Sequence, residues 1–119
     1  MIYNNINIHV YNWIPFAQGF VINSKHTVIT PIRASNDKQY VHIPSTCDLI
    51  QHEEQHCKDI ETKGWIDFFA TEGWQLIWKK HDVAGYEPNA ERAELNPNPT
   101  ELEQLIINYC NSHNLLYYY

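Results

Sequence analysis

Residues 49–59, LIQHEEQHCKD, place two histidines four positions apart, His52 and His56, with Glu53 directly after the first. Side chains at i and i+4 project from one face of an α-helix, so two imidazoles at this spacing can bind one zinc ion. A carboxylate beside the first histidine can accept a proton from a water held by that zinc. The stretch therefore predicts a helical zinc site in which Glu53 is the general base for hydrolysis of a peptide bond.

The place of Glu53 on this helix supports the prediction. At about 100° per residue, Glu53 falls at the centre of an apolar face. The same face carries Leu49, Ile50, Cys57 and Ile60. The opposite, solvent-facing side is expected to carry Gln51, Glu54, Gln55, Lys58 and Thr62. Burying an ionised carboxylate costs several kcal/mol unless it is paired or lies near a metal, and a zinc ion between the histidines supplies that partner.

A catalytic zinc site needs a third protein ligand and an open position. One class of zinc peptidase takes this ligand from a histidine six residues after the second, but that position is Thr62 here. The other common solution is a glutamate on a later helix. The stretch GYEPNAERAELNP offers Glu87, Glu91 and Glu94. We favour Glu91, because its small alanine neighbours let the helix approach the site closely; the other two stay open.

The strands that must support this helix are expected in residues 2–43. INIHVYNW alternates apolar and polar residues, as a half-buried strand does. Two short strands are predicted around the turn Asn23-Ser24-Lys25, followed by a loop over ASNDKQ and a last short strand, YVHI, ending at Pro44. The order of strands first and helices after predicts an α+β fold with a short N-terminal antiparallel sheet.

The helix that carries the histidines is predicted to begin at Ser45, with Asp48 completing a capping box, and to end near Gly64. A second helix is expected over 65–80 and a short one over 88–95.

A final helix over 101–111 is predicted from the capping box formed by Thr100 and Glu103. Its apolar face carries Leu102, Leu105, Ile106, Tyr109 and Cys110. The end of the chain, HNLLYYY, is compatible with either fraying or packing.

Composition narrows the classes of protein. A chain of 119 residues predicts one domain, 1–119, and a net charge of −6 without a basic cluster argues against a nucleic-acid partner. Three cysteines with no CxxC pair argue against a disulfide framework. The N-terminus does not read as a signal peptide, and no apolar stretch approaches the length of a membrane span. We therefore expect a cytoplasmic protein with no membrane partner.

LIQHEEQH, a following helix and GYEPNAERAE together resemble the small gluzincin-type zinc metallopeptidases, or minigluzincins, which bacteria and phages encode. GFVINSKHTVITP resembles the edge strand and turn that precede their active-site helix. The resemblance covers roughly residues 17–95. It implies a zincin-like fold in which His52 and His56 are zinc ligands, Glu53 is the catalytic base and Glu91 is the third ligand, with a peptide or protein as substrate.

The third ligand and the peptidase function each have alternatives. The order Glu91-Arg92-Ala93-Glu94 departs from the Glu-x-x-Ala usual in the family, so the third ligand is less fixed than the first two. A chain this short leaves little room for a deep substrate cleft, which favours a non-catalytic zinc-binding interaction or virion module on a peptidase-like fold. A binding protein without metal is the third possibility, because seven histidines make a chance motif more frequent. The oligomeric state and the cleavage preference are not readable from the sequence.

Overall fold

The computed structural model describes residues 1–13, 18–69 and 99–119. A four-stranded sheet, sheet A, has the order β1-β2-β4-β3 and is made of β1 Ile2–Tyr3, β2 Ile6–Val10, β3 Gly19–Asn23 and β4 His26–Ile29. A three-stranded sheet, sheet B, has the order β5-β6-β7 and is made of β5 Ile32–Ser35, β6 Lys38–His42 and β7 Leu116–Tyr118. The two helices with defined bounds are α1 Ile43–Lys63 and α4 Thr100–Ser112. The α+β prediction is confirmed.

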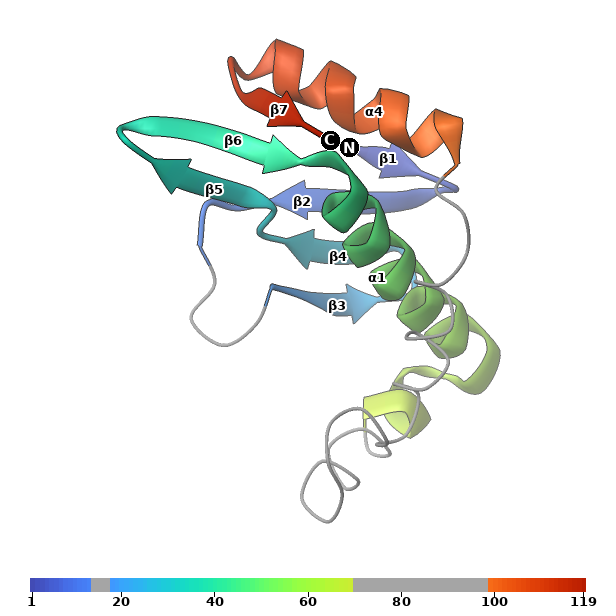
Figure 1. Cartoon of the computed structure of the whole chain (residues 1–119). Helices are drawn as coiled ribbons and strands as arrows, with labels where there is room; N and C mark the ends of the chain where they lie inside the picture. The colour runs from blue at the N-terminus through green and yellow to red at the C-terminus, as the bar shows by residue number, and fades with distance from the viewer. Residues whose placement is uncertain (14–17, 70–98) are drawn as a thin grey trace.

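Sheet A is mixed, whereas the sequence predicted an antiparallel sheet. The β1–β2 and β3–β4 pairs are antiparallel, but β4 inserts between β2 and β3 and runs parallel to β2. The hairpin at Asn23-Ser24-Lys25 is the reason, because the chain lays down the edge strand β3 first and then returns into the sheet as β4. The edge strand that results lies alongside α1 (Figure 1).

The tight hairpin between β5 and β6 depends on residues that tolerate the left-handed backbone region. Asn36 and Asp37 have φ of 51° and 65°, the pattern of a two-residue type I′ turn. This turn joins β5 to β6, with Ser35 opposite Lys38. The predicted loop over ASNDKQ is therefore wrong. The alternation of apolar and polar residues that marks a half-buried strand is missing there, because residues 34–39 are exposed on both faces of the hairpin.

Helix α1 begins earlier than its predicted cap. His42 is the N-cap residue, Ile43 is the first helical residue and Pro44 follows it, where proline lacks an amide hydrogen that the helix does not need. Ser45 is thus inside the first turn, and the predicted capping box is wrong. The Oγ of Ser45 lies 2.7 Å from Nδ1 of His42. The predicted end is confirmed, because Gly64 has a φ of 91° and its N–H donates to Ile60 O.

Helix α4 starts at Thr100 itself, after the N-cap Pro99, so the capping box predicted there is also wrong. Its predicted apolar face is confirmed. Leu102, Ile106 and Cys110 are fully buried. After a turn at Asn114, the chain forms β7, which pairs in parallel with β6. The C-terminal residues are therefore held by strand pairing instead of fraying, although the side chains of β7 stay exposed.

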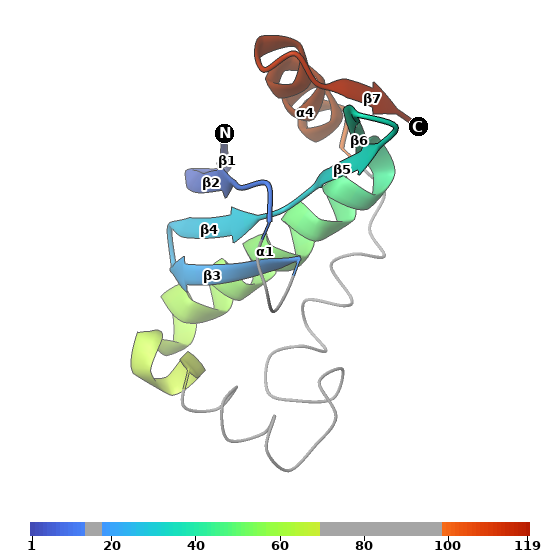
Figure 2. The same ribbon diagram turned by 90° about the vertical axis from the view of Figure 1, so that its left-hand side faces the viewer.

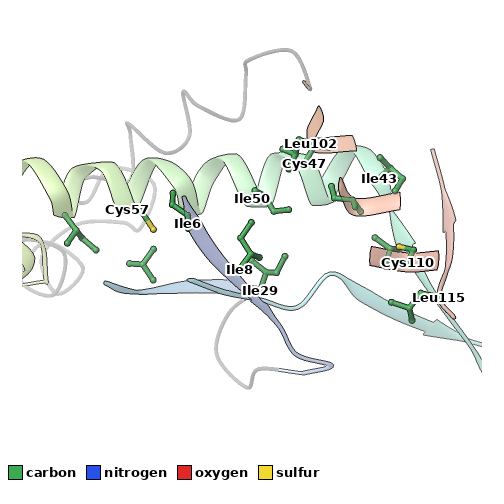
Figure 3. Packing of buried hydrophobic residues seen from close by; sticks show 14 of the residues in the cluster. Ile6, Ile8, Ile29, Ile43, Cys47, Ile50, Cys57, Leu102, Cys110 and Leu115 are labelled. Carbon is green, nitrogen blue, oxygen red and sulfur yellow. The ribbon is translucent and has the colours of Figure 1, made fainter. Parts of the chain in front are cut away.

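Helix α1 covers one face of sheet A, and α4 packs against α1 and β7 (Figures 1 and 2). The buried side chains of these elements form one continuous core (Figure 3). The core includes Ile6, Ile8, Ile29, Ile43, Cys47, Ile50, Cys57, Leu102, Cys110 and Leu115. Helix α1 is thus held by sheet A along one face and by α4 at a second side, which makes it a rigid support for the side chains that project from it.

Residues 65–69 are helical, which agrees with the start of the second predicted helix. The rest of that helix and the helix predicted over 88–95 lie outside the described residues. Within the described ranges, no helix is long and apolar enough to cross a membrane.

Candidate metal centre

The helix α1 carries the whole HEEQH stretch in regular helical conformation, as predicted. Glu53 is 3% exposed and His56 is 5% exposed, while His52 is half-buried. The inward position of Glu53 that its place on the apolar face predicted is confirmed. A carboxylate and two imidazoles thus lie on one side of one helix, where the i and i+4 spacing brings the two rings together.

The two imidazoles of this motif form a close pair. His52 Nε2 lies 3.2 Å from His56 Nε2, with ring centroids 4.8 Å apart and ring planes at 79°. Two nitrogens bound at about 2.0–2.1 Å to a tetrahedral zinc are separated by about 3.3 Å. The spacing of the pair therefore fits two ligands of a single ion.

Phe68 supports His56 from the helical segment that follows α1. Its ring meets the His56 ring edge to face, with centroids 5.4 Å apart, and Phe68 is 2% exposed. Such a contact limits rotation of the imidazole about its side-chain bonds and so fixes the direction of its nitrogens. Sequence reasoning missed Phe68, because only the turn at Gly64 brings the next helix back toward the histidines.

Glu53 is enclosed by the edge strand. A Cβ atom placed on Gly19 of β3 would lie 3.1 Å from Glu53 Oε1. The absence of a side chain at this position lets the strand close over the carboxylate. Gly19 was also missed, although a glycine inside a predicted strand signals close approach of another group.

Cys57, next to His56, is a small core residue, as expected from its place on the apolar face. It is 1% exposed, and its Sγ lies 3.5 Å from Asn23 O. Burial, with smaller contributions from Glu53 and Glu54, raises the pKa of the thiol to about 12. The thiol is therefore protonated at neutral pH and is not a nucleophile of this site.

The side of α1 predicted to face solvent is only partly exposed. Gln51 is 6% exposed, so its predicted position is wrong, and Asp59 is 9% exposed. The two belong to a polar stripe at i, i+4 and i+8 in which Gln55 Nε2 donates to Asp59 Oδ1 at 3.2 Å. The buried part of the helix surface is thus wider than the apolar residues alone indicate, because it includes polar side chains.

Glu54, also predicted for the solvent side, is mostly covered and bound at the surface. Its carboxylate accepts a hydrogen bond from Asn4 Nδ2 at 2.7 Å and lies 3.4 Å from Lys58 Nζ. Lys58 and Thr62 are exposed, as predicted. The two adjacent acids therefore differ: Glu53 points into the protein and Glu54 pairs at its surface.

The third ligand that the sequence predicts falls in a part of the chain that the structure does not describe. Glu91, together with the alternatives Glu87 and Glu94, lies outside the described residues. Among residues 1–13, 18–69 and 99–119, no group of three or more His, Cys, Asp or Glu side chains can hold a metal ion. The described part of the chain thus brings two imidazoles together, and their role as zinc ligands and the choice of Glu91 stay predictions.

A second histidine pair lies on sheet A, away from α1's motif. His9 Nε2 on β2 is 3.1 Å from His26 Nδ1 on β4. The ring centroids are 5.4 Å apart and the planes differ by 15°. Parallel pairing of the two strands brings these histidines together, which sequence spacing alone did not predict.

Comparison of the chain with protein-family models, with curated proteins and with solved structures gives no match.

Proposed function

We propose that this chain is a zincin-like zinc peptidase that hydrolyses a peptide bond in a peptide or protein substrate. One observation carries the proposal: the Nε2 atoms of His52 and His56 lie 3.2 Å apart on the helix that also buries Glu53. The ring centroids are only 4.8 Å apart, so the two rings do not lie on one line with their nitrogens, and this leaves room for both nitrogens to face a third atom. Zinc bound there, with Glu91 as the third ligand, would lower the pKa of a coordinated water toward about 7 and polarise a carbonyl group.

The roles of the protein side chains follow from their positions. His52 and His56 would hold the metal, and Phe68 packs against the His56 ring. Glu53, one residue after the first ligand, accepts the proton of the attacking water and passes it to the leaving amine. Its enclosure by β3 keeps bulk water from the carboxylate, so its interactions act in a region of low dielectric.

Glu53→Gln tests the catalytic role. The amide has nearly the shape of the carboxylate but does not accept the proton, so we expect about one zinc per chain and a loss of hydrolysis of at least about 100-fold. Elemental analysis of the purified protein measures the zinc, and mass spectrometry of a mixed peptide library measures cleavage. Glu54→Gln is the matched control, because it makes the same change one residue away, at the surface pair with Lys58. It should retain both properties, and hydrolysis that persists in Glu53→Gln contradicts the proposal.

A non-catalytic zinc-binding module is the second candidate, and the 3% exposure of Glu53 favours it. A carboxylate so enclosed can serve to orient the zinc site without reaching a substrate. In that case the wild-type protein binds one zinc, His52→Ala loses it, and no peptide of the library is cleaved. Unfolding at lower denaturant concentration after chelation of the metal would accompany this outcome, because zinc binding then contributes to folding.

A further inference from the structure

Gly19, the first residue of the edge strand β3, lies beside Glu53. A Cβ atom there would meet three neighbours: Glu53 Oε1 at 3.1 Å, Val28 O at 3.1 Å and Leu49 Cδ1 at 3.3 Å. All three distances are shorter than ordinary van der Waals contact between carbon and its neighbours. The space beside Gly19 is therefore filled by its surroundings, and one of them is the carboxylate.

The three neighbours differ in their freedom to move. Val28 O belongs to the backbone of β4, which is paired on both sides by β2 and β3 and cannot yield. Leu49 Cδ1 and Glu53 Oε1 are the far ends of side chains on α1. A methyl group at Gly19 is therefore held off by Val28 O on one side and pushes against the movable side chains of the helix on the other, the Glu53 carboxylate among them.

The backbone of Gly19 does not itself require glycine. Among the described residues, Gly64 is the glycine with a positive φ, so an alanine at Gly19 would not be strained by the backbone region it occupies. The effect of a side chain at this position is then steric, and it acts on the atoms that it touches.

We propose that Gly19 is a positioning residue for Glu53: the missing side chain on the edge strand sets where the carboxylate stands relative to the histidine pair. The inference rests on the proposed function, since it assigns the carboxylate as the base. A displacement of a few tenths of an ångström leaves the two imidazoles in place but changes the distance from the base to the water. A misplacement of about 1 Å can cost a factor of about 100 in rate, so we expect a fall in kcat of about tenfold in Gly19→Ala with a smaller change in KM.

A double-mutant cycle in stability tests the contact without substrate or metal. Gly19→Ala is combined with Glu53→Asp, which shortens the side chain, and with Glu53→Gln, which keeps its size and removes its charge. A steric contact with the carboxylate predicts that Gly19→Ala lowers the urea midpoint of unfolding less in the Glu53→Asp background than in wild type. The effect should be unchanged in the Glu53→Gln background. Ile22→Ala, which removes an exposed side chain from the same strand, should be additive with both.

The positioning role needs a second measurement, the pH dependence of the visible spectrum of the cobalt(II)-loaded protein. We expect Gly19→Ala to bind cobalt(II) as wild type does but to shift the midpoint of its spectral transition, and Ile22→Ala to leave the midpoint unchanged. Additive stability effects in the Glu53→Asp background, or an unshifted midpoint, overturn the inference while the zinc site stands. A wild-type protein that binds neither zinc nor cobalt(II) overturns the proposed function itself. If Gly19→Ala does not fold, folding of Gly19→Ala/Glu53→Asp supports the contact and failure of that variant to fold overturns it.

Discussion

Two histidine pairs with nearly the same nitrogen separation lie in different settings in this protein. His52 and His56 on α1 are 3.2 Å apart, and His9 and His26 on sheet A are 3.1 Å apart. The sheet pair has ring centroids 5.4 Å apart, as far as two five-membered rings permit at that nitrogen distance, with planes within 15°. The two rings therefore lie edge to edge in nearly one plane, and their nitrogens face each other along one line.

That arrangement is a single N–H···N hydrogen bond, in which one ring donates and the other accepts. The helix pair differs, because its centroids are only 4.8 Å apart and its planes are at 79°. Its rings do not lie on one line, so both nitrogens can face a third atom. The helix pair is also enclosed by Phe68 and the neighbouring Glu53, whereas the sheet pair is exposed. The two pairs thus differ in the direction and enclosure of their rings and not in the distance between their nitrogens, and it is on direction and enclosure that the proposed metal site depends.

Removal of one imidazole from each pair tests most directly whether the two pairs differ in zinc binding. His52→Ala and His56→Ala should each weaken zinc binding by at least about 100-fold, since loss of a ligand exceeds the roughly 10–100-fold effect of losing a ligand's supporting partner. His9→Ala and His26→Ala should change it by less than about twofold. Competition with a chromophoric chelator measures the affinity. Equal losses in the two pairs would show that the direction of the rings does not select the metal.

Loss of the aromatic support of His56 should have a smaller effect. Phe68→Leu keeps an apolar side chain of similar volume but removes the edge-to-face contact with the imidazole. Zinc affinity should fall about tenfold, the low end of the range for supporting partners. Phe69→Leu is the matched control, because Phe69 neighbours Phe68 and is only half-buried. The same chelator competition measures the zinc affinity of both variants. If Phe69→Leu bound zinc as weakly as Phe68→Leu, the affinity would depend on the helical segment as a whole and not on the ring contact with His56.

The helix pair was largely predictable from sequence, and the reason is that its geometry is local. The 3.6-residue period fixes the relation of His52 to His56 and places Glu53 inward, and Gly64 ends the helix as predicted. The contact of Gly19 with Glu53 was not predictable, because it depends on which strand becomes the edge of sheet A. The pair of His9 and His26 likewise needs the parallel alignment of β2 with β4.

Other elements were missed for different physical reasons. The hairpin at Asn36 and Asp37 is exposed without alternation over residues 34–39, so only its left-handed turn residues indicate that the chain turns there. The pairing of β7 with β6 joins the far end of the chain to its middle, which no local pattern encodes. Ser45 was chosen as a cap from its residue type, but Pro44 before it can occupy the first turn.

The dependence of stability on alkaline pH tests how completely the buried face of α1 is shielded from water. This face differs from the sheet pair of His9 and His26, which is exposed. Cys47 is fully buried, and burial, with Glu103 and Asp48 adding, raises the pKa of its thiol from 9.0 to about 12. Below pH 9 the thiol is protonated in both states. Between pH 9 and 12 only the unfolded chain releases the proton, so this contribution to the free energy of unfolding decreases as pH rises.

Urea unfolding at a series of pH values measures that decrease. The fall in the urea midpoint between pH 9 and 12 should be smaller in Cys47→Ser, whose hydroxyl does not titrate in this range, whatever the variant's stability at pH 7. Parallel curves for the two proteins would mean that the thiol reaches solvent and that this side of α1 is less covered than its contacts indicate.

The smallest effect is expected at the sheet pair itself. His9→Ala removes one partner of an exposed hydrogen bond, and water can replace it, so the free energy of unfolding should change by less than about 0.5 kcal/mol. Asn7→Ala, two residues before His9 on the same strand β2 and also bonded at the surface, is the matched control and should behave alike. Urea unfolding with and without added zinc measures both. If zinc stabilised wild type but not His9→Ala, the sheet pair would hold a metal ion in spite of its collinear rings, and direction would not be what distinguishes the two pairs.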